Sequence, residues 1–420
     1  MSKYQPYPQY KDSGVEWLGE VPEHWEVKRL KYFTTVNDET LSEKYDEDFE
    51  INYIDIGSVT TGYIQNSEVI LYSDAPSRAR RIVREGDILV STVRTYLKAI
   101  APVSHSENGY IASTGFAVIR SRNDVCSDYL KYALLSNYFI NLVESESTGI
   151  SYPAINASEL VTFNIALAPF EEQQVVANFL DNATCKIDTL IQKQQNLIEL
   201  LKEKRQALIS HAVTKGLNPH VKMKDSGVEW LGEVPEHWET ERLKYVCQIT
   251  TGNKDTENKE DCGEYPFYVR SQTIERINSY SYDGEAILTA GDGVGVGKVF
   301  HYVNGKFDYH QRVYMFYKFS KVKGKYLFEY MKNNLYKVAL EGGAKSTVDS
   351  LRLPLLQNFM ITVPPPEEQQ DIIFYLNNAT CKIDTLIAKA QQAIELLKER
   401  RTALISAVVT GKIDVRSVHE

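Results

Sequence analysis

An internal duplication constrains this chain more than any other feature. The segment KDSGVEWLGEVPEHWE, from Lys11 to Glu26, returns without a change from Lys224 to Glu239. A longer segment, which begins PFEEQQVVANFLDNATCKIDTLI at Pro169, returns almost unchanged from Pro365. The chain is therefore a short repeat, a unique region and a long repeat, followed by all three again. Two units are too few for a solenoid, so the pattern predicts two folding units built on one frame.

Each long repeat has the pattern of a coiled-coil helix. Its apolar residues step by three and four, which is the spacing of a seam between helices. A proline and a pair of glutamates begin each copy, as suits the positive end of a helix. We expect helices over 169–216 and 365–412, each about 60 Å long at 1.5 Å per residue, packed antiparallel on one another. The alternative is that each stripe packs on its own domain. The stripe residues are Leu180, Ala183, Ile187, Leu190, Leu197, Leu201 and Leu208, and then Leu376, Ala379, Ile383, Leu386, Ala390, Ala393, Leu397 and Leu404.

The two unique regions resemble one another only in pattern. Region 33–168 has strand-like stretches at Ile51 to Gly57, Gly86 to Val93 and Gly115 to Arg120, followed by a helical pattern from Ser127 to Leu142. Region 246–363 has the strand-like stretches EYPFYVR, EAILTA, GKVFHYV and QRVYMFYKF, and then a helical pattern from Tyr326 to Leu340. Because strands and helices do not alternate regularly, the prediction is an α+β fold with two mainly antiparallel-sheet domains, separated by the two long helices.

The repeats divide the chain into four segments. The first domain covers 1–168 and the second 217–364, and the long helices cover 169–216 and 365–420. The short repeat extends loosely over 11–32 in the first domain and over 224–245 in the second. We read its tryptophans as an aromatic clamp at each domain entrance, which serves packing more than ligand contact.

Composition bounds the class of protein. At 420 residues the chain is long enough for two or three domains. No signal peptide and no apolar run of membrane-spanning length is present, so we expect a cytoplasmic protein that does not enter a membrane. The five cysteines form no metal-binding or disulfide pattern. A net charge of -9 argues weakly against nucleic acid, although binding depends on where basic residues cluster.

Motifs for catalysis and cofactor binding are missing. The glycine-rich stretch from Gly291 to Lys298 fails the P-loop spacing, because Asp292 stands where a glycine is required and Val299 where a serine or threonine is required. A tight hairpin is the better structural interpretation, although glycines also permit close approach of the backbone to DNA. No paired carboxylates stand out for acid and base catalysis. We therefore expect no catalysis by this chain alone and no cofactor or metal bound to it.

Two basic clusters are the candidate site. Arginine suits phosphates and the guanine edge because its planar fork donates two parallel hydrogen bonds, and glutamine pairs similarly with adenine. A solvated basic face is the alternative. In the first unique region the candidates are Arg78, Arg80, Arg81, Arg84, Arg94 and Lys98. In the second they are Tyr268, Arg270, Ser271, Lys298, His310, Gln311 and Arg312.

These features together resemble the specificity (S) subunit of type I restriction-modification systems, also called HsdS. The resemblance covers the whole chain and is carried by the YKDSGVEWLGEVPEHWEVKRLKY repeat and the EEQQ helix openings. Further carriers are SRARRIVREGDILVSTVR from Ser77 and the stretch DGEAILTAGDGVGVGKVFHYVNGKFDYHQRVY from Asp283.

The resemblance implies a DNA-binding function without catalysis. Two target-recognition domains would each read one half of a bipartite, asymmetric site in double-stranded DNA, and the helices would set the gap. Two methylation subunits, which bind S-adenosylmethionine and modify adenine N6, would dock on the chain, and restriction subunits would join them. The rival hypotheses are a coiled-coil scaffold without DNA specificity and part of a self-contained restriction enzyme.

Overall fold

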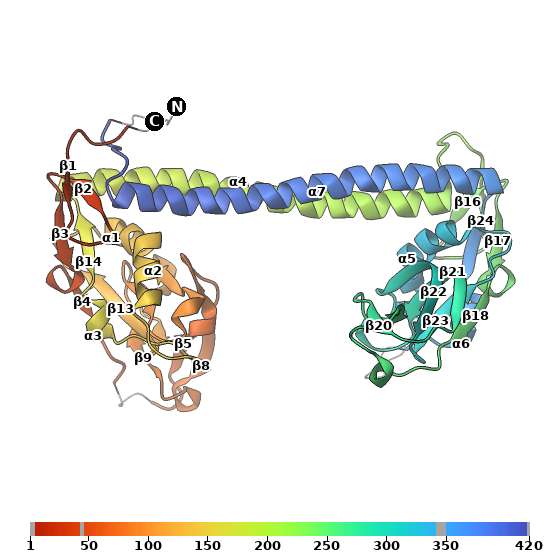
Figure 1. The fold of residues 1–420 in the computed structure, drawn as a ribbon, viewed down its shortest axis with the longest axis horizontal. Coiled ribbons are helices and arrows are strands. Elements are labelled where there is room, and N and C mark those ends of the chain that lie inside the picture. The colour runs from red at the N-terminus through yellow and green to blue at the C-terminus, as the bar shows by residue number, and fades with distance from the viewer. Residues whose placement is uncertain (1–4, 43–45, 342–349, 418–420) are drawn as a thin grey trace. The chain divides into compact units, whose positions relative to one another are not determined.

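The computed structural model describes residues 5–42, 46–341 and 350–417, and the chain forms two compact units (Figure 1). Unit 1 comprises Met1–Gln194 and Gln392–Glu420, and unit 2 comprises Gln195–Gln391. The boundary passes through both long helices, so each unit contains one half of each. No helix among the described residues is both long and apolar enough to cross a membrane.

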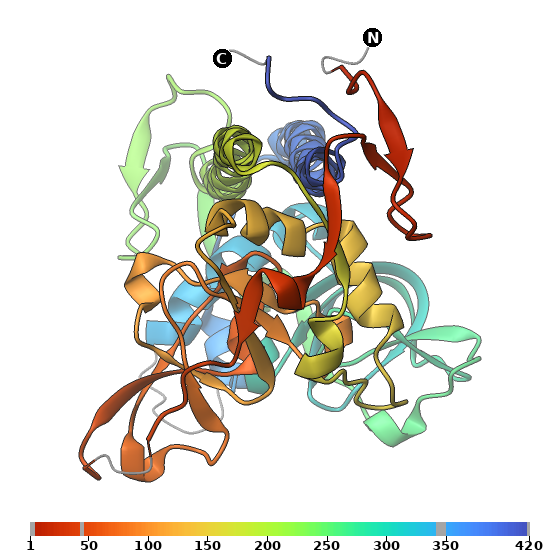
Figure 2. The same ribbon diagram turned by 90° about the vertical axis from the view of Figure 1, so that its left-hand side faces the viewer.

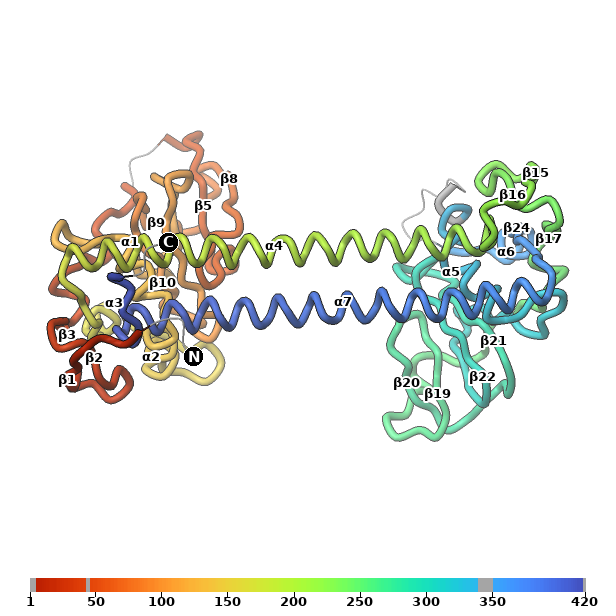
Figure 3. Tube along the Cα trace, turned by 90° about the horizontal axis from the view of Figure 1, so that it is seen from above, coloured from red at the N-terminus to blue at the C-terminus, as the bar shows by residue number. Residues whose placement is uncertain are grey.

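The two long helices confirm the expectation from the repeats. Helix α4 spans Phe170–Lys215 and helix α7 spans Pro366–Val409. In unit 1 the first half of α4 packs on the second half of α7, whereas in unit 2 the second half of α4 packs on the first half of α7 (Figure 3). The helices are therefore antiparallel within each unit.

One ion pair appears in both units with its partners exchanged. In unit 1, Nε of Arg401 lies 2.9 Å from Oδ1 of Asp188. In unit 2, Nε of Arg205 lies 2.8 Å from Oδ1 of Asp384. The repeat aligns Asp188 with Asp384 and Arg205 with Arg401, so each helix supplies an aspartate to one pair and an arginine to the other. This exchange is what a pseudo-two-fold relation between the repeats produces.

The seam between the helices differs from the predicted stripe in the middle. Leu190 and Leu197 are 46% and 43% exposed, whereas Ile198 is 7% exposed and Ile191 packs against the core. In α7, Leu386 is likewise exposed, whereas Ile394 is buried. The stripe shifts by one residue because 3.6 residues per turn do not match a strict seven-residue repeat. The expected leucines at these positions were therefore wrong, although the coiled-coil pattern holds.

Unit 1 contains mostly antiparallel strands. One sheet has the order β11-β10-β13-β4 and a second the order β8-β5-β12-β9, where only the β5–β12 pair is parallel. Short two-stranded pairs β1-β2, β14-β3 and β6-β7 complete it. The strands are β1 (Tyr10–Asp12), β2 (Glu20–Pro22), β3 (Glu26–Arg29), β4 (Thr34–Val36), β5 (Glu50–Ile54), β6 (Val59–Thr60), β7 (Tyr63–Ile64), β8 (Glu68–Leu71), β9 (Ala79–Ile82), β10 (Ile88–Ser91), β11 (Ile100–Pro102), β12 (Ile111–Ser113), β13 (Phe116–Ser121) and β14 (Asn164–Leu167).

The helix predicted over 127–142 is broken in two. Helix α1 spans Ser127–Leu134 and helix α2 spans Asn137–Ser145, and a short helix α3 follows at Ala157–Leu160. The Ser136 hydroxyl donates to the carbonyl of Ala133 and accepts from the N–H of Phe139. It thus caps α2, which is the competition with a continuous helix that serine side chains offer.

Unit 2 contains one larger sheet, with the order β18-β23-β21-β22-β19-β20. Only its β19–β22 pair is parallel, and helix α5 (Gly324–Glu341) confirms the predicted helix. Helix α6 spans Leu353–Asn358. The strands are β15 (Met223–Asp225), β16 (Glu233–Pro235), β17 (Glu239–Arg242), β18 (Gln248–Thr251), β19 (Tyr265–Tyr268), β20 (Glu275–Ile277), β21 (Tyr282–Ala290), β22 (Phe300–Tyr309), β23 (Val313–Tyr317) and β24 (Met360–Val363), and β17 pairs with β24. Both units confirm the α+β class with mainly antiparallel sheets.

The short repeat fastens each unit to its long helices. In unit 1 the indole N–H of Trp25 donates to Glu172 over 3.0 Å, and in unit 2 that of Trp238 donates to Glu368 over 2.9 Å. Figure 2 shows the β1–β2 hairpin beside the end of α7, where the Tyr10 hydroxyl donates to the carbonyl of Gly411. Trp25 and Trp238 are fully buried, which confirms the packing role expected of the repeat for these two residues. The expectation was wrong for Trp17, whose side chain is 73% exposed.

The glutamine that follows this glutamate serves the same geometry. Gln173 accepts from the N–H of Cys126 and donates to the carbonyl of Ala168. Gln369 accepts from the N–H of Lys323 and donates to the carbonyl of Pro364. Each glutamine therefore joins the start of a long helix to the residues just before α1 or α5, which explains why the motif is present in both repeats.

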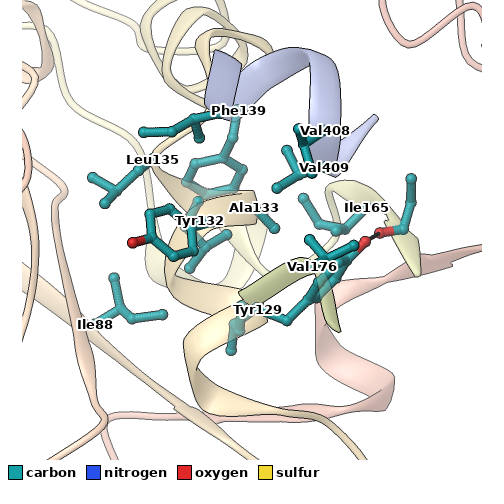
Figure 4. Close-up of a cluster of buried hydrophobic side chains, with 14 of the residues drawn as sticks. Ile88, Tyr129, Tyr132, Ala133, Leu135, Phe139, Ile165, Val176, Val408 and Val409 are labelled. Atoms are coloured by element: carbon teal, nitrogen blue, oxygen red, sulfur yellow. Dashed lines mark hydrogen bonds between the residues drawn. The ribbon is translucent and has the colours of Figure 1, made fainter. Parts of the chain in front are cut away.

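The core of unit 1 joins both long helices to the domain. Tyr129 and Phe139, from α1 and α2, pack with Val176 of α4 and with Val408 and Val409 of α7 (Figure 4). Burial of this shared apolar surface fixes the domain on the helix pair, because each large apolar side chain contributes about 1.5–3 kcal/mol when removed from water.

Candidate nucleic-acid interface

The first basic cluster is spread along strand β9 and the turn after β10. Arg78 precedes the strand and Arg84 follows it. The Arg78 side chain is exposed and donates from Nε to the Tyr53 hydroxyl over 3.0 Å, with Asp55 at 3.5 Å from Nη2. Its guanidinium is thus oriented by β5 and the turn after it, while much of it still faces solvent.

The guanidinium of Arg84 is compensated by a carboxylate. It donates to Glu39 from Nη2 over 2.6 Å, and Arg120 donates to the same carboxylate over 2.7 Å. Hydrogen bonds from Arg84 and Arg120 lower the pKa of Glu39 to about 2. Arg120 also binds Asp87, whose side chain is 1% exposed. This network ties β4, β9, β10 and β13 together, so Arg84 has a structural partner that Arg78 does not share.

Arg80 and Arg81 lie within β9 itself. Arg80 donates from Nη1 to the Tyr72 hydroxyl over 3.3 Å. The Nε of Arg81 is buried and has no hydrogen-bond partner within the described residues. Alternation along a strand places these two side chains on opposite faces of the sheet.

Arg94 and Lys98 flank a short turn after β10, close to the Arg78 end of β9. Both have left-handed backbones, with φ of 52°. The Arg94 guanidinium lies 5.0 Å from the centre of the Tyr152 ring, a cation–π arrangement, and Lys98 pairs with Glu144 at 3.1 Å. Thr114 and Gly115 connect the Arg78 end of β9 to the turn after β10. The N–H of Thr114 donates to the Arg78 carbonyl, and the carbonyl of Gly115 accepts from the N–H of Thr92.

In unit 2, Arg270 and Arg312 converge on one carboxylate. Nη1 of Arg270 lies 2.8 Å from Oδ1 of Asp292, and Nη1 of Arg312 lies 2.7 Å from Oδ2. Burial is the largest single influence on the Asp292 carboxyl and by itself raises its pKa. The hydrogen bonds and charges of the two arginines together outweigh it and hold the pKa of Asp292 below its usual range. Arg270 and Asp292 line a cleft of about 350 Å³ with Ser271 and His310. Arg312 reaches this site through its bond to Asp292.

The other aromatic and polar candidates have internal partners. Burial lowers the pKa of His310, whose side chain is 3% exposed, and its Nδ1 accepts from the N–H of Arg312. Gln311 donates from Nε2 to Asp255 over 2.5 Å. Tyr268 is buried against Phe307 and His301. The hydrogen bond from the Arg312 N–H makes His310 a support of the Arg312 backbone.

Ser271 and Lys298 frame the same loop region. The Ser271 hydroxyl donates to the carbonyl of Thr273, and its own carbonyl faces Nε2 of His301. Lys298 is exposed, and its carbonyl accepts from Gln272. The predicted set in unit 2 is therefore gathered on adjacent segments, with the two arginines at its centre.

Sequence reasoning missed the groups that orient the arginines. Asp292, Glu39, Tyr53 and Tyr152 were not candidates, because each comes from a segment distant in sequence from the arginine that it contacts. In the sequence, Asp292 stands out only as a departure from the P-loop pattern. The glycine-rich stretch that contains it connects the antiparallel strands β21 and β22, so a hairpin is present. The expectation of a tight hairpin was wrong, because the connection contains a 3-10 turn at Gly293–Gly295.

Comparison with known proteins defines the class. The family model for the type I restriction modification DNA specificity domain matches residues 22–200 and again residues 235–396. The chain belongs to this family and carries its domain twice. It is a DNA specificity subunit of the type I restriction-modification class.

Individual relatives agree with this class. The type I restriction enzyme EcoDI specificity subunit of Escherichia coli is 28% identical over 182 residues, which is 43% of this chain and 40% of that protein. The MjaVIII specificity subunit of Methanocaldococcus jannaschii is 25% identical over 95% of both chains. The chain thus aligns with less than half of the first relative and with nearly all of the second.

Solved structures share the fold. A chain from a structure of a type I restriction-modification system, described in terms of complex assembly and conformational transition, has a TM-score of 0.73 at 22% identity and covers 94% of this chain and 99% of its own. The HsdS subunit from Thermoanaerobacter tengcongensis has a TM-score of 0.54 at 21% identity, over 96% and 100% of the two chains.

Proposed function

We propose that this chain selects the DNA sequence on which a type I restriction-modification complex acts, and that each unit reads one half of a bipartite site in double-stranded DNA. The observation that carries the proposal is the presence of two unlike sheet domains, each with exposed, oriented arginines, on one duplicated frame. A duplicated frame suits the pseudo-symmetric backbone of a duplex, and unlike domains give an asymmetric site.

The long helices carry the second part of the proposal. Helices α4 and α7 each continue from one unit into the other, so we assign to them the number of base pairs between the half-sites. We assign the docking of two methylation subunits to the exposed faces of these helices, where Cys185 and Cys381 occupy corresponding positions. Those subunits would bind S-adenosylmethionine and modify adenine N6, and restriction subunits would join the complex in the cytoplasm.

Domain exchange tests the reading of half-sites. Residues 33–168 would be replaced by the same region of another specificity subunit, and the methylated sites of a genome expressing the complex would be sequenced. We expect one half of the site to change, while the other half and the gap stay as they were. Changes in both halves would refute independent reading, and no sequence preference at all would refute the proposal.

Catalysis by the chain alone has its own test. Purified chain would be incubated with DNA and labelled S-adenosylmethionine, with and without methylation subunits. We expect methyl transfer only when those subunits are present. Transfer by the isolated chain would favour a self-contained enzyme, and unchanged site preference on its omission would favour a scaffold.

A further inference from the structure

Asp292 holds two arginine side chains in fixed positions at the surface of unit 2. Each of its carboxylate oxygens accepts one hydrogen bond, from Arg270 and from Arg312. The aspartate side chain is 14% exposed, whereas those of Arg270 and Arg312 are 42% and 59% exposed. The carboxylate is therefore sheltered beneath the guanidinium groups, which remain open to a ligand.

The glycines of the β21–β22 connection make this arrangement possible. A Cβ at Gly291 would lie 2.9 Å from the carbonyl oxygen of Arg312, and one at Gly295 would lie 2.7 Å from that of Arg270. Side chains at these positions would push the loop away from both arginine segments. The glycine-rich stretch thus brings Asp292 between the arginines, which is a reason for its composition other than phosphate binding.

The arginines retain donors for a ligand. A guanidinium carries five N–H donors, and the bond to Asp292 uses one on each. Because Nη1 is held, the remaining fork of each group has a fixed direction before the ligand arrives. Pre-orientation lowers the entropy lost on binding, since a long side chain is otherwise free to rotate.

The ligand chemistry follows from the carboxylate between the two cations. A phosphate oxygen would meet the negative charge of Asp292 as well as the arginines, whereas the N7 and O6 edge of guanine is an uncharged pair of acceptors. Arginine forks pair with that edge in the major groove. Two apolar side chains line the cleft, the buried Val269 and the exposed Val294. They also suit the flat edge of a base more than a hydrated anion.

We propose that the surface group of Arg270, Asp292 and Arg312 is a guanine-reading subsite, in which each arginine reads one guanine and Asp292 is the positioning residue for both. This inference rests on the proposed function, because it assigns bases to the half-site that unit 2 reads. It predicts guanines at two positions of that half-site. Base preference in the other half-site should not depend on Asp292.

The variant Asp292→Asn separates positioning from charge. Asparagine offers one acceptor oxygen and can hold only one arginine, so preference for guanine should fall roughly 5-fold to 150-fold at one position. Asp292→Ala should relax both positions. Affinity for DNA of unrelated sequence should stay level or rise slightly, because a negative charge has been removed from the binding face.

The measurements use the assembled complex with its methylation subunits. Binding selection from randomised duplexes gives the base preference at each position, and titration with an unrelated duplex at two salt concentrations gives non-specific affinity. Asp283→Asn is the matched control, since it removes the same charge from an exposed position of β21. It should leave base preference unchanged.

Arg270→Lys and Arg312→Lys carry the test if the Asp292 variants do not fold. Each keeps the charge and loses the fork, so guanine preference should fall at one position while the salt dependence is retained. Loss of affinity equally across all sequences would show a phosphate contact and overturn the inference. Guanine preference that survives Asp292→Ala would overturn it too. A parent complex without any sequence preference would refute the proposed function instead.

Discussion

Glu172 is the residue whose removal we expect to lower the stability of unit 1 most, because two buried hydrogen-bond donors share one of its carboxylate oxygens. The Tyr7 hydroxyl lies 2.6 Å and the Trp25 indole nitrogen 3.0 Å from Oε1, while His24 lies 2.8 Å from Oε2. The glutamate is 7% exposed. Burial and the neighbouring carboxylate raise the pKa of Tyr7, so its hydroxyl remains a donor across the working pH range.

The expected cost follows from these contacts. Glu172→Ala leaves two buried donors unpaired at about 1–3 kcal/mol each, so we expect a loss of about 4 kcal/mol in unit 1. Glu172→Gln keeps an oxygen at the Oε1 position for both donors and should cost about 1 kcal/mol. Glu368→Ala in unit 2 strips one buried donor, Trp238, and should cost about 2 kcal/mol.

Amide hydrogen exchange resolves the two units. Opening free energies would be compared for peptides from β1 to β3 and the first turns of α4, and for their counterparts in unit 2, because a single melting temperature does not separate two units. Each variant should affect its own unit. The reasoning fails if Glu172→Gln costs as much as Glu172→Ala, or if Glu368→Ala costs more than Glu172→Ala.

Three further predictions concern the charged groups. Arg78→Ala should weaken DNA binding by the assembled complex and reduce the salt slope by about one, whereas Arg84→Ala should affect binding less and lower the melting temperature, because Glu39 already pairs with it; equal effects on binding would contradict this division. Arg401→Asp should destabilise unit 1, because it breaks the pair with Asp188. Adding Asp188→Arg to this variant should restore about 0.5–1 kcal/mol of stability, measured in a double-mutant cycle. A coupling energy of zero would be the contrary result. The pKa of Glu39 is about 2 in the folded chain against 4.5 ordinarily, so its stabilisation is complete above pH 4.5 and is lost as the pH falls toward 2. Glu39→Gln should therefore lose less melting temperature over that interval than the parent chain, and parallel curves would disprove the pairing.

The long helices illustrate how far local pattern reaches. Their limits were predicted closely, because proline and glutamates mark the start, and Gly216 and Gly411, with positive φ, follow the ends. The position of the seam at Leu190 and Leu197 was not predicted, because leucine periodicity over a long helix cannot reveal a one-residue drift. Only the packing of a partner helix selects which neighbouring apolar residue is buried.

The candidate site shows the same limit in another form. The sequence predicted Arg78, Arg270 and Arg312 as candidates for DNA binding, since the chemistry of a guanidinium belongs to the residue itself. It could not separate Arg84 from Arg78, because Glu39 lies 45 residues away along the chain. Nor could it assign a role to Asp292, whose partners come from the segment after β19 and the turn before β23.

The sequence by itself determined the duplication, the class of fold, the two long helices and the residue types available for binding. Those properties follow from repeats, periodicity and side-chain chemistry, all of which are local along the chain. Tertiary structure alone decided which arginines are compensated, which carboxylate orients them, and how one repeated glutamate comes to hold a buried tryptophan in each unit. Such choices require groups distant in sequence to meet, and that proximity exists only once the sheets and helices have packed.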